Sequence, residues 1–173
     1  MPRGCGDSRS RGPSGPPAEG RQERASNRSG APAVLRPRPL RVAVVDDDRW
    51  LREQRAAALC RTGRIEVVLV GDHADALARS GWDDVDVLMV DGDDGTFAAT
   101  GGELAGVRVV ERVRLERSPA QTGVAVLTGL PHDAVKVRMA AAGADVLYGH
   151  AQICTPAALV SVVEAVQPIV TRH

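Results

Sequence analysis

Residues 42–52 read VAVVDDDRWLR, in which a short apolar run leads into three aspartates and then into residues that favour a helix. An apolar run followed by a polar residue occurs twice more. Val85–Val90 is followed by Asp91, and Val124–Leu127 is followed by Thr128. These runs are apolar at consecutive positions, which is typical of strands that are covered on both faces. The sequence therefore predicts buried strands that each end in a polar residue.

Helix-favouring segments separate the apolar runs. The expected strands are Leu40–Val45, Ile65–Val70, Val85–Val90, Val124–Leu127 and Val146–Tyr148. The expected helices are Arg49–Arg61, His73–Arg79, Leu104–Arg117, Asp133–Ala142, which Gly143 ends in a left-handed conformation, and a last helix from an N-cap at Thr155 and Pro156 to about Val170. Five strand–helix units in strict alternation predict an α/β fold, with an open parallel sheet between two layers of helices.

The first 38 residues differ in composition from the rest of the chain. They are rich in Gly, Pro, Ser and Arg, and residues 1–40 carry eight arginines against three acids. Such a segment cannot bury enough apolar surface to offset its chain entropy. We therefore expect a disordered basic tail at 1–38 and one folded domain at 39–173. The tail is either a plain leader, which is the simpler interpretation, or an arm that contacts nucleic acid or an acidic partner.

The remaining bulk features indicate a soluble protein. The cysteines Cys5, Cys60 and Cys154 are odd in number and lack metal-ligand spacing, so we expect reduced thiols. No apolar run approaches the roughly 18–20 residues that span a bilayer. We therefore expect a cytoplasmic protein with no membrane partner. The tryptophans Trp50 and Trp82 are expected to be partly buried packing residues.

The polar residues at the strand ends are the candidates for chemistry. Ligands of open α/β sheets bind at the carboxyl ends of the strands, where Asp46–Asp48, Asp91 and Thr128 would converge. Two or three carboxylates in one cavity repel each other unless a cation joins them, and hard oxygen ligands suit Mg²⁺. A carboxylate held against a divalent ion can also attack phosphorus and form an acyl phosphate.

The sequence resembles the receiver domains of two-component response regulators over roughly Leu40–Thr171. The resemblance is carried by VAVVDDDRWLR, DVLMVD, VAVLTG and AAAGADVLY together with the helix that follows. It implies a flavodoxin-like, doubly wound five-stranded parallel sheet with strand order 2-1-3-4-5 and helices on both faces. It also implies a stand-alone, non-enzymatic signalling domain whose partner is a sensor histidine kinase or another signalling protein.

The resemblance assigns a role to each polar strand end. Asp46 and Asp47 would bind Mg²⁺ together with Asp91 and the backbone carbonyl of Asp93. Asp91 would accept the phosphoryl group from the kinase, and Thr128 would contact the phosphoryl oxygens.

Three departures from the family pattern concern the response to phosphate. After the fifth strand, where the family usually has a lysine, this chain has His150. The only lysine of the chain is Lys136. A free histidine has a pKa near 6.5 and a shorter reach than lysine. At the position on the fifth strand where the family has an aromatic switch residue, this chain has Leu147. The neighbouring Tyr148 should point to the opposite face of the sheet. The segment 92–106 is about seven residues longer than usual, rich in glycine, and is interpreted as a mobile flap.

Several alternatives stay open on the sequence alone. The domain could act without phosphorylation through protein contacts, with a homodimer as one possibility. It could also be a transcription regulator, either through its basic tail or as a descendant of a DNA-binding regulator without its output domain. A third alternative is a haloacid-dehalogenase-like phosphatase, with Asp91 and Asp93 in its Asp-x-Asp motif. That motif fits poorly, because its threonine, Thr96, comes one place late and Lys136 would have to serve as its lysine.

Overall fold

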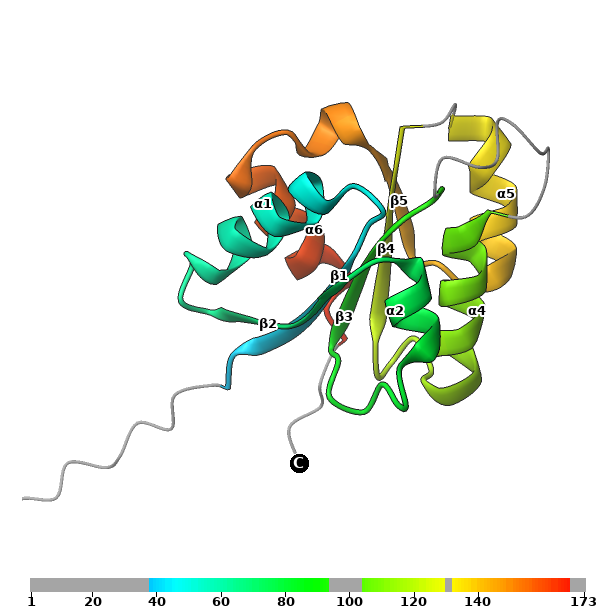
Figure 1. The fold of residues 1–173 in the computed structure, drawn as a ribbon, viewed down its shortest axis with the longest axis horizontal. Helices are drawn as coiled ribbons and strands as arrows, with labels where there is room; N and C mark the ends of the chain where they lie inside the picture. Colours follow the sequence, from blue (N-terminus) through cyan, green and yellow to red (C-terminus); the bar gives the residue numbers. More distant parts are fainter. Residues whose placement is uncertain (1–37, 94–103, 130–131, 169–173) are drawn as a thin grey trace, which may run out of the picture. The chain divides into compact units, whose positions relative to one another are not determined.

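The computed structural model describes residues 38–93, 104–129 and 132–168. Five strands form one sheet in these residues: β1 (Leu40–Val45), β2 (Ile65–Gly71), β3 (Val87–Asp91), β4 (Gly123–Thr128) and β5 (Val146–Gly149). They are ordered β2-β1-β3-β4-β5, and every neighbouring pair is parallel (Figure 1). The predicted fold class and strand order are confirmed.

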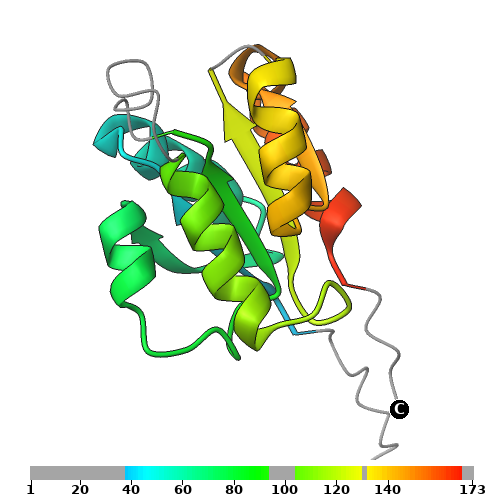
Figure 2. The ribbon, with the colours of Figure 1, turned by 90° about the vertical axis from the view of Figure 1, so that its right-hand side faces the viewer.

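Helices cover both faces of the sheet. The helices are α1 (Arg49–Cys60), α2 (His73–Ala78), α4 (Ala105–Glu116), α5 (His132–Ala142) and α6 (Pro156–Val166), with a short 3₁₀ helix η1 (His150–Ile153) before the last. Helices α1 and α6 lie on one face, and α2, α4 and α5 lie on the other (Figure 1). Figure 2 looks onto the second face, where α4 and α5 lie side by side.

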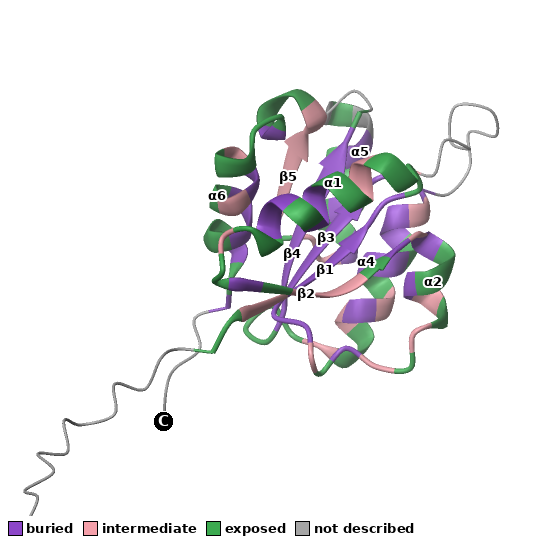
Figure 3. Ribbon diagram, turned by 60° about the vertical axis from the view of Figure 1, so that its left-hand side comes forward, coloured by how far each residue is buried: buried purple, intermediate pink, exposed green. Residues whose placement is uncertain are grey.

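The core consists of two apolar layers, one on each face of the sheet. Because successive side chains of a strand point to opposite faces, Val42 and Val44 pack toward α1 and α6, whereas Ala43 and Val45 pack toward the other helices. Strands β3 and β4 are accordingly buried along their whole length, and β1 is buried from Val42 to Val45 (Figure 3). Leu147 and Tyr148 also face opposite layers, as the sequence predicted.

The helix boundaries follow the expected capping residues in most places. Thr155 accepts a hydrogen bond from the backbone N–H of Ala158, and Gly143 ends α5 with a φ of 98°. The last helix ends at Val166, so its predicted extension to Val170 is wrong. Pro168 explains the early end, because the residue before a proline is disfavoured in the helical conformation, and Gln167 has a ψ of 134°. The helix η1 was not anticipated.

The third strand begins two residues later than the sequence indicated. Trp82–Val85 forms a turn, in which the N–H of Val85 donates to the carbonyl of Trp82, and pairing of β3 with β1 starts at Val87. The remaining element ends differ from the predictions by one or two residues, which is within the usual variation of helix and strand ends. None of these shifts moves a polar residue away from the carboxyl end of its strand.

The two tryptophans lie in opposite environments. Trp82 is fully buried between α2 and β3, with the Arg79 guanidinium 5.4 Å from its ring centre. Trp50 is 65% exposed, so the expectation that it is a partly buried packing residue is wrong. It precedes the buried Leu59 by nine residues, about two and a half turns of helix, and therefore lies on the solvent side of α1.

A network of ion pairs joins the amino-terminal ends of the strands. Arg38 bonds Asp86 with both terminal nitrogens, at 2.9 and 2.6 Å, and the backbone N–H of Arg41 donates to the same carboxylate. Asp84 accepts from Arg79 and, at 3.3 Å, from Arg41. The hydrogen bond from Arg79 is the main reason why the pKa of Asp84 lies below its ordinary value.

In the described residues no helix is both long and apolar enough to cross a membrane.

We expect Asp84→Asn to weaken the fold in a pH-dependent way. A lowered pKa means that the folded state favours the ionised carboxylate, so the stabilisation is complete above the ordinary value of 3.8 and is lost as the pH falls through the folded pKa. The loss at pH 7 should be roughly 0.5 kcal/mol, because the pair is about one-third open to solvent and screened. Urea unfolding of variant and wild type at pH 7 and in acid measures the difference.

The control for this prediction is Asp83→Asn. Asp83 is 95% exposed and pairs with Arg117 at 3.2 Å, so its replacement should change the free energy of unfolding very little at any pH. A pH-independent loss in Asp84→Asn would contradict the ion-pair explanation.

Candidate functional site

Four of the predicted site residues meet at the carboxyl edge of the sheet. Asp46 follows β1, Asp91 ends β3, Thr128 ends β4, and His150 follows β5. Asp46, Asp91 and Thr128 are buried, and His150 is about one-third exposed. One ligand atom each from Asp46, Asp91 and His150 lie within 4.8 Å of one another. The structure therefore forms a compact polar pocket from residues far apart in the sequence.

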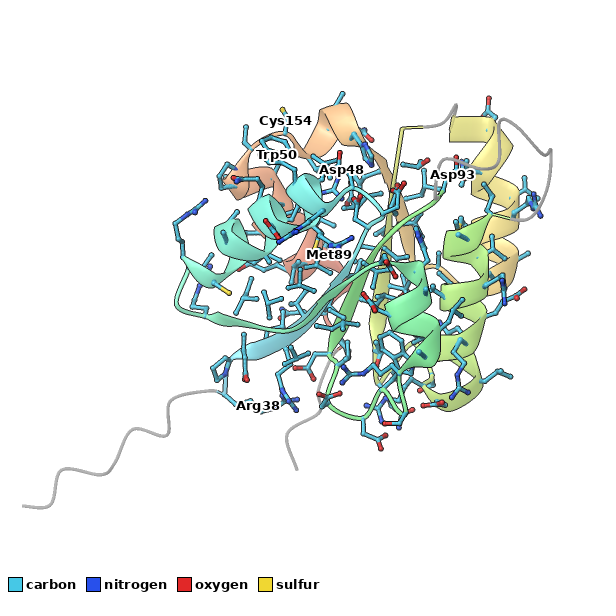
Figure 4. All side chains as sticks on the ribbon, in the orientation of Figure 1. Arg38, Asp48, Trp50, Met89, Asp93 and Cys154 are labelled. Atoms are coloured by element: carbon cyan, nitrogen blue, oxygen red, sulfur yellow. The ribbon has the colours of Figure 1, made fainter. Side chains whose placement is uncertain are left out.

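The orientation of this pocket can be followed from its labelled neighbours. Asp48, Trp50 and Asp93 lie near the upper edge of the molecule in Figure 4, and Arg38 lies at the opposite end. Asp48 caps α1, since its carboxylate accepts from the backbone N–H groups of Trp50 and Leu51. The third aspartate of the sequence motif therefore starts the helix and is not part of the pocket.

Two of the predicted metal ligands are placed less centrally. Asp47 is exposed, and its pKa is raised by partial burial and by the nearby charge of Asp91. Asp93 is half-buried and directly precedes residues 94–103, which lie outside the described residues. Most of the predicted flap, with Asp94 and Thr96, lies outside the described residues.

The backbone of Asp91 is held by contacts from three elements. Gly92 donates its N–H to the Asp91 carboxylate at 2.9 Å and to the carbonyl of Leu127 in β4 at 2.8 Å. Gly106 of α4 lies so close that a Cβ atom there would be 2.3 Å from the Asp91 carbonyl oxygen. The third contact comes from α2.

This third contact is His73, which the sequence reasoning missed. His73 is buried, and its Nε2 lies 2.9 Å from the Asp91 carbonyl oxygen. Because a carbonyl only accepts, Nε2 must carry the proton of this hydrogen bond. The available sequence signal was the position of His73 directly after Gly71-Asp72, since the end of β2 lies at the same edge of the sheet as Asp91.

A second missed residue is Arg55, which enters the pocket from α1. Its side chain is only 9% exposed, and it forms an ion pair with the Asp46 carboxylate. Leu59, four residues later on the same helix face, is fully buried in the core. The sequence signal was an arginine in the apolar stripe of the predicted helix 49–61, nine residues after Asp46.

Both oxygens of the Asp46 carboxylate accept a hydrogen bond in this structure. Oδ1 accepts from the backbone N–H of Asp48 at 2.9 Å, and Oδ2 accepts from Arg55. Burial is the largest influence on Asp46 and raises its pKa above the ordinary value. Arg55 acts against burial, and the charge of Asp91 adds to it. Asp46 is thus a buried carboxylate that depends on Arg55 for its charge compensation.

His150 contacts the pocket from the opposite side. Its Nε2 lies 3.3 Å from Oδ1 of Asp91 and has no hydrogen-bond partner among the described residues. The imidazole therefore lies within ion-pair distance of the Asp91 carboxylate. An added oxygen ligand on Asp91 would be the natural partner for this nitrogen.

The donor atoms suit a hard divalent cation in part. Asp46 and Asp91 offer carboxylate oxygens, as Mg²⁺ requires, and His150 adds a nitrogen that Mg²⁺ does not need. However, both oxygens of Asp46 already accept hydrogen bonds. A divalent cation in this pocket would have to share Asp46 with Arg55 or displace the arginine.

Comparison with solved structures places this fold among receiver domains. The signal receiver domain of the response regulator NarL from Mycobacterium tuberculosis is 26% identical, with a TM-score of 0.60, and the match covers 75% of this chain and 98% of that chain. The chemotaxis protein CheY4 of Vibrio cholerae is 24% identical, with a TM-score of 0.59, and the match covers 74% and 98%. The resemblance to receiver domains is confirmed, and the fold of this chain is that of the response-regulator receiver.

The same fold also occurs in a protein with a different description. The pilus assembly protein CpaE from Burkholderia thailandensis is 19% identical, with a TM-score of 0.56, and the match covers 73% of this chain and 97% of that one. No protein-family model matches the sequence, and no curated protein matches it. Because one fold can carry several functions, the function has to be argued from the pocket.

We expect Gly106→Ala to destabilise the protein by about 1–3 kcal/mol, although alanine favours a helix over glycine by up to about 1 kcal/mol. The new methyl group would overlap the Asp91 carbonyl oxygen and approach Cα of Gly92 at 3.0 Å. Urea unfolding measures the change. Gly81→Ala is the control, because no atom lies within 4 Å of the added methyl group. Equal stability of Gly106→Ala and wild type would show that α4 does not press on Asp91.

Proposed function

We propose that this protein is an atypical receiver domain in two-component signal transduction, with Asp91 as its phosphoryl acceptor. The observation that carries the proposal is the convergence of Asp46, Asp91, Thr128 and His150 at the carboxyl edge of a receiver fold. The partner would be a sensor histidine kinase or another signalling protein. If phosphate is not transferred, the same surface would act through protein contacts alone.

The pocket supports this chemistry through residues with distinct tasks. The Asp91 carboxylate would attack the phosphorus of a phosphohistidine, forming the aspartyl phosphate as the imidazole leaves. His73 and Gly106 hold the Asp91 main chain in place during the attack. The hydroxyl of Thr128 would donate to a phosphoryl oxygen, and His150 would donate from Nε2.

We further propose that Mg²⁺ is the cofactor of this transfer. When bound, it would neutralise negative charge that builds up between the carboxylates and the phosphoryl oxygens. The residues for this site would be Asp46, Asp47, Asp91 and the carbonyl of Asp93. Asp46 and Asp91 have the buried placement that a shared cation requires.

His150 makes the proposed receiver atypical. A lysine supplies a permanent positive charge on a long flexible stem, whereas an imidazole is charged only when it is protonated. His150 would hold the aspartyl phosphate through a hydrogen bond from Nε2, over a shorter reach than a lysine has. Leu147 is a second difference from the family pattern. A leucine has no aromatic ring, so a signal could not be coupled through the rotamer of a ring at this position.

The alternative functions gain less support from the geometry. A haloacid-dehalogenase-like reaction would need Lys136 near Asp91, and Lys136 is exposed on α5. A role in transcription would rest on the basic tail, which lies outside the described residues. The described residues carry no observation that favours a homodimer or a contact with nucleic acid.

Acetyl phosphate labelling tests the function. Wild type treated with acetyl phosphate and Mg²⁺ should gain the mass of one phosphoryl group, and hydroxylamine should remove it, because acyl phosphates react with this nucleophile. Asp91→Asn should remain unlabelled. Asp83→Asn, which changes an exposed carboxylate at the other end of the sheet, should be labelled like wild type. Labelling of Asp91→Asn to the wild-type level would refute Asp91 as acceptor.

A further inference from the structure

The arginine on α1 is an unusual neighbour for a proposed metal site. Arg55 occupies a core-facing position of its helix, next to the buried Ala56 and four residues before Leu59. Its guanidinium reaches past the end of β1 to the Asp46 carboxylate. An arginine is rarely buried unless it is paired, so the position is explained by this one contact.

Arg55 and a divalent cation would use the same oxygen atoms. Each oxygen of the Asp46 carboxylate accepts one hydrogen bond, Oδ1 from the N–H of Asp48 and Oδ2 from Arg55. A divalent cation that binds Oδ2 therefore meets the guanidinium of Arg55. A second arginine, Arg52, donates to the carbonyls of Asp46 and Asp47 at 3.0 and 3.4 Å. The α1 side of the pocket thus holds two positive side chains against the acidic motif.

The charge balance of the pocket points in the same direction. Asp46, Asp47 and Asp91 contribute three negative charges, and Arg55 is the buried cation among them. The lysine of the family pattern would stand beside the acceptor, whereas this arginine stands beside the proposed metal ligand. The buried positive charge of Arg55 thus lies on the α1 side of the pocket, beside Asp46.

We propose that Arg55 is an internal competitor of the divalent cation, so that Mg²⁺ binds this pocket only when Asp46 is released from the Arg55 ion pair. In the metal-free protein the guanidinium compensates the Asp46 charge and keeps the pocket closed. This inference rests on the proposed function, because Arg55 would compete for Asp46 with the Mg²⁺ ion of that function. Arg55 is a positioning residue in this scheme, acting on the metal through Asp46.

Arg55→Met tests the competition directly, with Mg²⁺ alone as the probe. Methionine keeps an unbranched apolar stem and removes the charge, so Asp46 loses its counter-ion and should bind Mg²⁺ about tenfold more tightly than in wild type, or better. Titration is followed by Trp50 fluorescence and by the backbone amide signal of Asp48, whose N–H bonds Asp46. NaCl of equal ionic strength controls for screening.

Thermal unfolding supplies a second readout that a purely structural arginine would not change. Without Mg²⁺, Arg55→Met leaves a buried carboxylate uncompensated and should unfold at a lower temperature than wild type. Mg²⁺ should raise the unfolding temperature of Arg55→Met strongly and that of wild type only slightly. The matched control is Arg64→Met, which removes an exposed charge paired with Glu164 and should leave the Mg²⁺ dependence unchanged.

Each outcome decides the proposal. Equal Mg²⁺ affinity in wild type and Arg55→Met, whether strong or undetectable, overturns it. If Arg55→Met folds only with Mg²⁺, the proposal is supported. If Arg55→Met does not fold in either condition, Arg55→Gln replaces it, and failure of both to fold with Mg²⁺ overturns the proposal in favour of a structural role.

The labelling experiment separates this inference from the proposed function. Labelled Asp91 with an unchanged Mg²⁺ affinity in Arg55→Met would reject the competitor and keep the receiver function. Tighter Mg²⁺ binding without any labelling of Asp91 would keep the competitor and reject the phosphoryl acceptor.

Discussion

Helices cover the parallel sheet on both faces, and this double burial decides where polar chemistry can occur in the chain. A strand such as Val42–Val45 has no solvent-facing side, so an ionisable side chain within it would be buried in one apolar layer or the other. Polar residues are therefore restricted to the strand ends. At the carboxyl edge, the ends of β1, β3 and β4 and the residue after β5 lie near one another, and a pocket of buried acids follows from the topology.

This constraint also explains which parts of the structure the sequence could predict. Consecutive apolar residues ending at Asp46, Asp91 and Thr128 indicate both the strands and the edge at which their ends meet, without knowledge of any distance. Capping residues such as Thr155 and Gly143 have local causes and were likewise predictable. The early end of α6 is also a local effect, since Pro168, which follows the C-cap residue of the helix, is visible in the sequence.

The contacts that could not be predicted are those made between elements. Arg55 and His73 reach the pocket from helices, and their positions depend on how α1 and α2 are rotated against the sheet. An arginine in an apolar stripe indicates a buried partner but does not identify Asp46 as that partner. The burial of Trp50 and Trp82 also depends on contacts between elements. The residue type alone does not indicate whether such a side chain lies on the surface or in the core. Sequence reasoning thus found the acids of the pocket and missed its cation.

The main-chain peptide at Asp91 has a mechanical consequence for the whole domain. Its carbonyl oxygen is bonded by His73 of α2, the following glycine is tied to β4, and Gly106 brings the backbone of α4 to closest approach. These three neighbours belong to α2, β4 and α4, so a displacement of the Asp91 peptide would disturb contacts with three elements at once.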